Sequence, residues 1–268
     1  MIRTAALRPS LGVEVTGIDD WLDRAVIDQC LEALKWRGVL LVRGADLDDE
    51  TQLAFSRRIG EVVNVNGSEI FTVSLDPAKN VAAEYLRGTF QWHIDGTTDP
   101  VPIKATTLTA RHVAAVGGGT EFASTYAAYD QLPEEERERC RGLRVVHSFG
   151  ASQRLVKPHA SDREKAFWDT LPKQEVSLVW ERADGRCSLV IGSTADHVVG
   201  MDPDESRALL DGLLEHATRE RFRYTHEWRV GDLVMWDNTG MLHRALPYDA
   251  SSQREMHRTT IFGEEAFT

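Results

Sequence analysis

Two residues in the first half of the chain have the types and the spacing of a metal site. His93 and Asp95 are two residues apart, so in an extended segment both side chains project to the same face. An imidazole and a carboxylate supply two of the three protein ligands of a facial non-haem Fe(II) site. The third ligand must come from elsewhere, and His243 in the segment Trp236–Arg244 is the candidate. The alternative is a surface histidine beside a turn aspartate, a spacing that chance produces in a chain with 9 histidines.

Length and composition are those of an ordinary globular chain. The 268 residues suffice for one large β-rich domain, and a hydrophobic content of 42% is enough for a sizeable core. No apolar run approaches the roughly 20 residues that a membrane-spanning helix needs. The N-terminus lacks the apolar segment and cleavage site of a secretion signal. We therefore expect a single domain over residues 1–268 with no membrane contact and no secretion.

The charge balance restricts the partners of the protein. The 31 Lys and Arg against 42 Asp and Glu give a formal net charge of −11. A nucleic-acid or anionic-membrane binder needs a broad basic face, so neither partner is expected. A local basic pocket is compatible with this charge, and Arg254, His257 and Arg258 cluster close to the C-terminus.

Three cysteines indicate the cellular compartment. Cys30, Cys140 and Cys187 are odd in number and do not have the spacing of a metal site. We expect free thiols in a reducing environment, and therefore a cytoplasmic protein.

The hydrophobic pattern predicts a strand-rich fold with helices at its edges. Helices are expected at residues 21–36 with Asp19 and Asp20 as the cap, and at 48–59, 124–131, 133–141 and 202–219. Strands are expected within residues 7–18 and at 39–42, 70–75, 103–111, 143–149, 176–182, 188–191, 222–230, 233–236 and 257–262. The three glycines at 117–119 predict a flexible turn. Together these elements favour an antiparallel sandwich or jelly roll with flanking helices.

Two arginines near the C-terminus would complete an oxygenase site. Two imidazoles and one carboxylate leave three positions on octahedral iron, enough for a bidentate cosubstrate and O₂. A dicarboxylate cosubstrate needs a cation for its far carboxylate, and the planar fork of arginine pairs with two oxygens. Arg254 and Arg258 are expected on or next to the last strand, alongside the strand that bears His243. The alternative for both is a solvated face.

Several motifs in the same order and spacing resemble the taurine dioxygenase / 2,4-dichlorophenoxyacetate dioxygenase family of Fe(II)- and 2-oxoglutarate-dependent oxygenases. The resemblance extends from Leu11–Val15 and Phe55–Gly60 to the C-terminus, through Trp92–Asp95, Gly118–Thr120, Trp236–Asn238 with His243, and Arg254 with Met256–Thr259. It implies a double-stranded β-helix (a cupin-like jelly roll) with iron held by His93, Asp95 and His243. Halogenating relatives have a small residue in place of the aspartate, so Asp95 argues against halogenation.

The resemblance also implies how the cosubstrate and the substrate are held. Thr120 would hydrogen-bond the distal carboxylate of 2-oxoglutarate, Arg254 would form a salt bridge with it, and Arg258 would face the acidic group of the primary substrate. Decarboxylation of 2-oxoglutarate to succinate and CO₂ in the presence of O₂ would drive hydroxylation of a substrate C–H bond. When that carbon bears a sulfonate, sulfate ester or aryl ether oxygen, the C–S or C–O bond then breaks.

The chain departs from the taurine enzyme at several positions. Arg58–Glu61 is not followed by the histidine that helps to bind sulfonate, and Gly96 with the next two threonines replaces bulkier residues. Gly192–Ala195 lacks the aromatic residue of the taurine pocket. These departures argue against taurine and favour a different, larger organic anion anchored by Arg258.

Alternatives remain for the outcome of the reaction and for the other site residues. The same cofactor chemistry can give desaturation or another oxidation in a biosynthetic pathway, and a jelly roll can bind metal or 2-oxoglutarate without catalysis. Trp92 and Trp236 are expected to pack behind the ligands, whereas Asp237 and Asn238 would shape the turn before His243. Structural roles are expected for the remaining histidines that lie outside the motifs, namely His112, His147, His159, His197, His216 and His226. Related enzymes suggest a homo-oligomer, a dimer or a tetramer.

Overall fold

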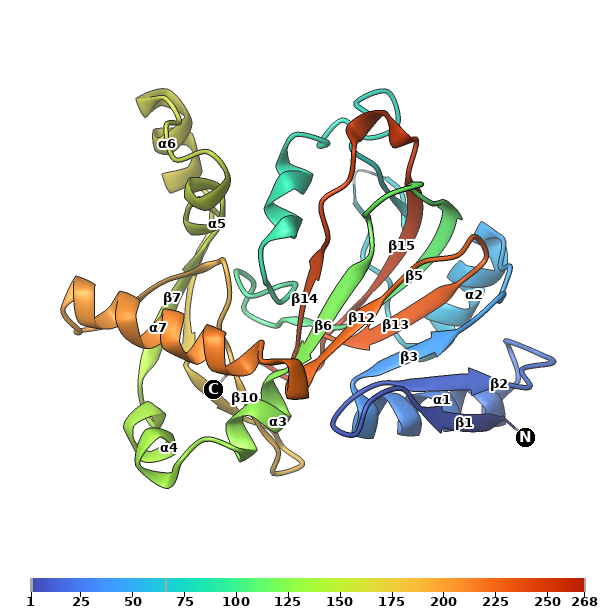
Figure 1. The fold of residues 1–268 in the computed structure, drawn as a ribbon, viewed down its shortest axis with the longest axis horizontal. Helices are drawn as coiled ribbons and strands as arrows, with labels where there is room; N and C mark the ends of the chain where they lie inside the picture. The colour runs from blue at the N-terminus through green and yellow to red at the C-terminus, as the bar shows by residue number, and fades with distance from the viewer. Residues whose placement is uncertain (1, 66, 268) are drawn as a thin grey trace.

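A seven-stranded sheet forms the larger layer of the molecule (Figure 1), with strand order β1-β2-β3-β13-β5-β15-β4. The computed structural model describes residues 2–65 and 67–267. The strands of this sheet are β1 (Arg3–Ala6), β2 (Val13–Thr16), β3 (Val39–Val42), β13 (Leu233–Asp237), β5 (Ile103–His112), β15 (Glu255–Phe262) and β4 (Phe71–Val73). Neighbouring strands pair antiparallel, except that β2 and β3 are parallel.

A smaller antiparallel sheet packs against the larger one and completes the sandwich. It contains β12 (Arg223–His226), β6 (Thr120–Ser124) and β14 (Met241–Ala245), with β6 in the middle. Side chains of both sheets share one core cluster, including Leu108 of β5, Phe122 of β6 and Trp236 of β13. The two facing sheets form the jelly roll that the sequence predicts.

Two helices cover the outer face of the larger sheet. The apolar faces of α1 (Arg24–Arg37) and α2 (Asp49–Ile59) bury Ile27 and Phe55 against residues such as Met235 of β13. The expected start of the first helix was wrong: the Asp23 carboxylate, not Asp19 or Asp20, caps α1 by accepting from the backbone N–H groups of the first turn. The second helix begins after Asp48 and ends at Gly60, as expected.

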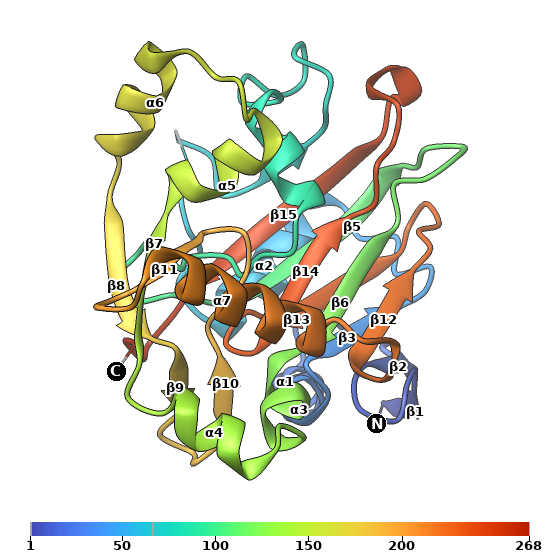
Figure 2. The same cartoon turned by 60° about the vertical axis from the view of Figure 1, so that its left-hand side comes forward.

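A long insertion between β6 and β12 forms a lobe beside the sandwich (Figures 1 and 2). It contains α3 (Thr125–Asp130), α4 (Glu134–Cys140), β7 (Arg144–Ser148), α5 (Phe149–Val156), α6 (Asp162–Asp169), β8 (Lys173–Ser177), β9 (Val179–Glu181), β10 (Cys187–Leu189), β11 (Ala195–Val198) and α7 (Pro203–Ala217). Helix α7 buries its leucine stripe in this lobe. Three short 3-10 helices, η1 (Tyr85–Phe90), η2 (Glu220–Phe222) and η3 (Ala250–Ser252), lie in connections.

Several expected elements differ in the structure. Helices α5 and α6 were not expected, because the buried face of α5 consists of Gly150, Ser152 and Gln153 and has no apolar stripe. The strand expected over 176–182 divides between β8 and β9, which pair with different partners. The strand expected over 222–230 ends at His226. None of the helices in the described ranges combines the length and apolar character needed to cross a bilayer.

The expected neighbour of the last strand was also wrong. β15 pairs with β5 and β4 in the larger sheet, whereas β14, which bears His243, pairs with β6 in the smaller one. Arg258 and His243 nevertheless line one cavity, because the two sheets face each other. The site therefore spans the sandwich rather than one sheet.

Candidate active site

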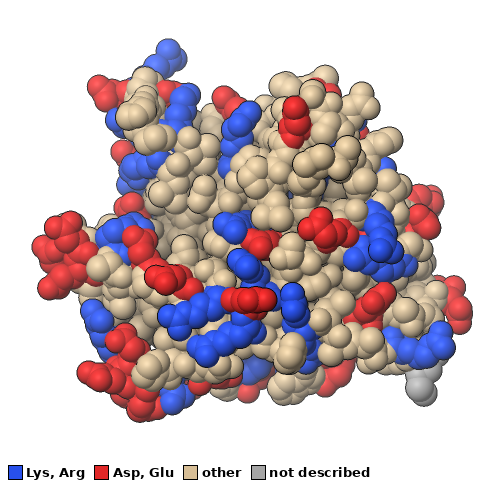
Figure 3. All heavy atoms as spheres, viewed as in Figure 1, with Lys and Arg blue, Asp and Glu red and all other residues tan. Residues whose placement is uncertain are grey.

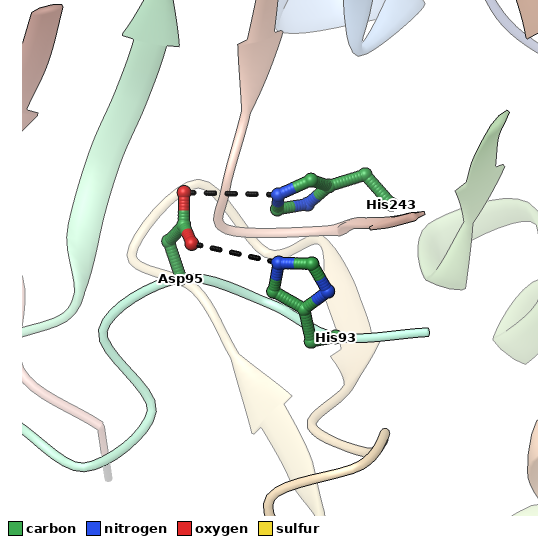
Figure 4. A group of neighbouring side chains, drawn as sticks. All are labelled: His93, Asp95 and His243. Carbon is green, nitrogen blue, oxygen red and sulfur yellow. Dashed lines mark ion pairs between the residues drawn. The ribbon is translucent and has the colours of Figure 1, made fainter. Parts of the chain in front are cut away.

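His93, Asp95 and His243, here called the ligand triad, lie together inside the sandwich (Figure 4). A two-residue bridge joins the backbones of His93 and His243, with N–H···O distances of 3.0 and 2.9 Å. This bridge places the two imidazoles side by side, with ring centroids 4.1 Å apart. Asp95 lies two residues further along the loop and faces both rings. Its carboxylate oxygens are 3.8 Å from Nε2 of His93 and 3.7 Å from Nε2 of His243.

The triad has the chemistry and the spacing to hold a divalent metal ion. One donor atom from each residue lies within 4.8 Å of the other two, and one ion with ligand distances of about 2.1 Å can bridge them after small side-chain movements. Two nitrogens and one carboxylate form the donor set of non-haem iron sites. Nδ1 of His93 lies 2.8 Å from the carbonyl oxygen of Gln91, to which it donates, so Nε2 presents its lone pair to the metal position.

A chain of hydrogen bonds orients the carboxylate of Asp95. The Thr106 hydroxyl on β5 donates to Asp95 Oδ2 at 3.3 Å, and the amide of Asn238 donates to that hydroxyl at 2.8 Å. The indole N–H of Trp236 donates to the Asn238 carbonyl oxygen at 2.9 Å, and the same indole packs 4.8 Å from the ring of His243. Asn238 therefore does more than shape the turn before β14, and the role of Thr106 carries no local sequence signal.

Burial and neighbouring charges keep the triad in the protonation states that metal binding requires. Burial by itself raises the pKa of Asp95, but His243, Arg258 and His93, with the Thr106 hydrogen bond, outweigh it and hold the pKa below its ordinary value. Burial, followed by repulsion from His93, lowers the pKa of His243 to about 3. A neutral imidazole and an ionised carboxylate are the ligand forms.

Thr120 and Arg254, here called the Thr120/Arg254 wall, line one cavity with His93 and His243, and this cavity measures about 50 Å³. Arg254 is buried, and its Nε donates to the carbonyl oxygen of Gly118 at 3.0 Å. Its guanidinium stacks on Tyr248 at 4.8 Å, and no carboxylate in the described residues pairs with it. Burial lowers the pKa of Arg254, so an anionic ligand in the cavity would stabilise the charge.

The glycine triplet at residues 117–119 leaves room for the Arg254 side chain and is more than a flexible turn. Gly118 has φ +74°, and a Cβ there would lie 3.0 Å from the Cδ of Arg254. A Cβ on Gly117 would lie 2.2 Å from the carbonyl oxygen of Pro247. The glycines let the backbone approach the arginine closely.

Arg258 lines the same cavity next to the triad. Its Nη1 is 3.8 Å from Asp95 Oδ2, and its guanidinium stacks on Phe71 at 5.1 Å. Its Nε is buried without a hydrogen-bond partner among the described residues. The structure thus brings together all six residues selected from the sequence. By contrast, His147 is buried, and its two ring nitrogens form hydrogen bonds with Thr194 and Val190. His197 pairs with Asp196 at the surface.

Comparisons with known proteins agree with this geometry. Residues 3–260 match the family described as taurine catabolism dioxygenase TauD, TfdA family. The chain is 36% identical to the alpha-ketoglutarate-dependent 2,4-dichlorophenoxyacetate dioxygenase of Cupriavidus pinatubonensis, with 94% of each chain covered. It is 30% identical to an alpha-ketoglutarate-dependent sulfate ester dioxygenase of Pseudomonas putida, with 95% of this chain and 87% of the relative covered.

A solved structure of a metal complex has the same architecture. The crystal structure of AAD-2 in complex with Mn(II) and N-oxalylglycine superposes with a TM-score of 0.86 and 31% identity over 100% of both chains. Fold, donor set and relatives lead to one conclusion. The chain belongs to the taurine catabolism dioxygenase TauD, TfdA family, and is an oxidoreductase that uses Fe(II), 2-oxoglutarate and O₂.

Proposed function

We propose that the ligand triad holds the catalytic Fe(II) and that the enzyme hydroxylates a small organic anion beside it. The observation that carries the proposal is the convergence of three metal donors and two arginines on one cavity inside the sandwich. The donors come from the loop before β5 and from β14, so only the folded sandwich assembles them. In this proposal the whole chain, residues 1–268, works as one dioxygenase domain.

Thr120 and Arg254 hold the distal carboxylate of 2-oxoglutarate in this proposal. Support comes from the burial of Arg254 and from the lack of a carboxylate partner among the described residues. A buried cation without a counter-ion is costly, and an anionic ligand removes that cost. The keto acid end then extends toward the triad across the same cavity.

The protein contributes geometry and exclusion of water. Bound Fe(II) chelated by 2-oxoglutarate supplies the oxidising chemistry, in which O₂ and the cosubstrate give succinate, CO₂ and one oxygen atom for the substrate. The three triad residues would hold the metal and leave its remaining positions to 2-oxoglutarate and O₂. Arg258 holds the acidic group of the primary substrate, so that a C–H bond lies close to the metal and away from bulk water.

The relatives support a substrate with an acidic group next to a C–O bond. One acts on 2,4-dichlorophenoxyacetate and another on sulfate esters. Hydroxylation of a carbon that bears an ether or ester oxygen gives a hemiacetal-type product. That product breaks the C–O bond and releases a carbonyl compound together with the phenol or sulfate. We propose this class of substrate for the chain, with Arg258 as the anchor.

An anaerobic titration followed by turnover tests the proposal. Fe(II) and then 2-oxoglutarate should produce the weak visible charge-transfer band of the chelate. Under O₂, aryloxyalkanoates, sulfate esters, sulfonates and other small acids are then screened for faster succinate release. His93→Ala should abolish the band and the turnover. Absence of the chelate in folded, iron-loaded protein would exclude the proposed site.

The role of Arg258 is tested by comparing the Michaelis constants of the two organic ligands. Arg258→Gln should raise the constant for the primary substrate by more than about tenfold, because a charge-assisted hydrogen bond is lost. The constant for the cosubstrate should change much less. Equal losses for both ligands would contradict the assignment.

We propose further that the protein is cytoplasmic and forms a homo-oligomer that contacts neither nucleic acid nor membrane. The three free cysteines support a reducing compartment. On the face in Figure 3, basic side chains alternate with acidic ones and form no broad basic surface. Leu155 and Phe167, on α5 and α6, are 55% and 51% exposed, which supports a contact between copies. Light scattering coupled to gel filtration would test the assembly, and a monomer at all concentrations would exclude it.

A further inference from the structure

Trp228 contacts Thr120 of the Thr120/Arg254 wall without itself lining the cavity. It lies outside every motif of the sequence. The chain leaves β12 after His226, and the Trp228 side chain turns back into the core. Its indole N–H donates to the Thr120 hydroxyl oxygen at 2.9 Å. The ring is buried and stands perpendicular to the imidazole of His226, with centroids 4.4 Å apart. The indole is therefore held in one orientation.

This hydrogen bond determines which role remains for the Thr120 hydroxyl. An indole N–H can only donate, so the Thr120 oxygen must accept from it. The hydroxyl proton then needs an acceptor of its own. The described residues contain no second hydrogen bond of this oxygen, and Thr120 lines the cavity together with Arg254. The free proton thus faces a ligand position.

The resulting wall presents donors only. Thr120 and Arg254 both line the cavity; the guanidinium of Arg254 donates to the carbonyl oxygen of Gly118 and bonds Tyr248, but no carboxylate in the described residues neutralises its charge. A carboxylate satisfies both, whereas a methyl group in the same place leaves two buried donors unpaired. A site built to hydrogen-bond a ligand group rejects an analogue that lacks it.

We propose that Trp228 is a positioning residue that fixes the Thr120 hydroxyl as a donor and thereby makes the enzyme selective for 2-oxo acids with a distal carboxylate. The inference rests on the proposed role of Thr120 and Arg254. Without the indole N–H, the hydroxyl can rotate among its staggered positions and act as donor or acceptor. Carboxylate binding must then also order the Thr120 hydroxyl, and this entropic cost lowers the affinity for the carboxylate.

The test compares two cosubstrates that differ at one end. 2-Oxovalerate has the carbon skeleton of 2-oxoglutarate with a methyl group in place of the distal carboxylate. In anaerobic Fe(II)-loaded protein, Trp228→Phe should weaken the binding of 2-oxoglutarate about tenfold, as expected for one hydrogen bond to a charged ligand network. The affinity for 2-oxovalerate should stay within about twofold. Thr120→Ser keeps the hydroxyl and should bind 2-oxoglutarate far better than Thr120→Val.

A matched control separates the hydrogen bond from the loss of an indole ring. Trp180 is also buried, and its indole N–H has no hydrogen-bond partner among the described residues. Trp180→Phe makes the same chemical change away from the cavity. It should leave the ratio of the affinities for the two cosubstrates unchanged.

A double-mutant cycle decides whether Trp228 acts through Thr120. If it does, Trp228→Phe should have almost no effect on 2-oxoglutarate binding in a Thr120→Val background. An equal loss in both backgrounds would overturn the inference while leaving the proposed function intact. Failure of the unmutated protein to bind 2-oxoglutarate would instead remove the proposed function.

A measurement that does not depend on the folding of Trp228→Phe is also available. In Zn(II)-loaded unmutated protein, the indole N–H resonance of Trp228 can be identified by its change in Thr120→Val. It should shift when 2-oxoglutarate is added and should not respond to 2-oxovalerate. An indole resonance that ignores 2-oxoglutarate would overturn the inference.

Discussion

At the scale of single residues, the orientation of Asp95 depends on groups that do not touch the metal. Thr106 links the Asp95 carboxylate to Asn238, and through it to Trp236. Such partners fix the direction of a ligand and tune its basicity, and their loss weakens metal binding. We therefore expect Thr106 to support the proposed metal site, although it is not itself a metal ligand.

Thr106→Val should weaken Fe(II) or Co(II) affinity by about 10- to 100-fold, because it removes the donor to Asp95 and the acceptor of Asn238. Competition with a chromophoric chelator measures the affinity. Thr107→Val is the matched control on the same strand, since the buried hydroxyl of Thr107 has no hydrogen-bond partner in the described part of the chain. Equal affinities of the two variants would contradict the role of Thr106.

Gly118→Ala tests the close approach of the glycine triplet to Arg254. The added Cβ would push against the Cδ and Nε of Arg254, and we expect the binding of 2-oxoglutarate to weaken by more than about tenfold with little change in metal affinity. Gly142→Ala is the control for backbone strain, since Gly142 has φ +75° and nothing within 4 Å of its Cβ position. Identical cosubstrate affinities in both variants would show that contact with Arg254 is unimportant.

At the scale of elements, His147 ties the lobe to the loop that carries His93 and Asp95. From β7, its Nε2 donates to the carbonyl oxygen of Val190 at 3.2 Å, and its Nδ1 accepts from the Thr194 hydroxyl at 2.9 Å. The Thr194 oxygen lies 2.9 Å from the hydroxyl of Thr97, in the turn after Asp95. This use of both ring nitrogens requires a neutral imidazole.

The stability of the protein should therefore fall as the pH falls, partly because of His147. Burial lowers its pKa from 6.5 to about 4, against the opposing hydrogen bond to Val190. Between these values the unfolded chain takes up a proton that the folded protein does not. His147 should thus remove up to about 3 kcal/mol from the free energy of unfolding between pH 7 and pH 4.

Urea unfolding of the unmutated protein and of His147→Gln at several pH values measures this contribution. The variant should lose less stability on acidification than the unmutated protein, even if it is less stable at pH 7. Parallel stability curves would show that His147 does not titrate in this range.

At the scale of the whole molecule, the proposed metal would join the two layers of the sandwich. His243 belongs to the smaller sheet, whereas Arg258 and the Thr106 support of Asp95 belong to the larger one. An ion bound by the triad therefore holds the layers together, and it binds the folded state only, because unfolding separates the ligands.

Metal should raise the free energy of unfolding by about 3 kcal/mol when its free concentration is about 100 times its Kd. Thermal unfolding with and without Mn(II) measures this effect, and a chelator should reverse it. His243→Ala should remove the dependence on metal. A metal-induced shift that survives in His243→Ala would place the ion elsewhere.

Much of this arrangement can be predicted from the sequence because its signals are local. The His-x-Asp spacing and the alternating strands predict a metal site and a jelly roll, and the resemblance to the dioxygenase family adds the roles of Thr120, Arg254 and Arg258. α5 escaped prediction because its buried face is polar and small. The pairing of β15 with β5 and β4 escaped because strand order depends on contacts far apart in the chain.

The order of the amino acids alone specifies the type of chemistry, because donor identity and spacing are fixed by covalent connection. Which groups orient those donors is settled by the packing of the folded chain. Thr106 and Trp228 contact Asp95 and Thr120 across gaps of 11 and 108 residues. A hydrogen bond of this kind needs two side chains brought within about 3 Å by the fold, here by the pairing of β12 with β6 and by the path of the loop before β5, and no spacing along the chain specifies that approach.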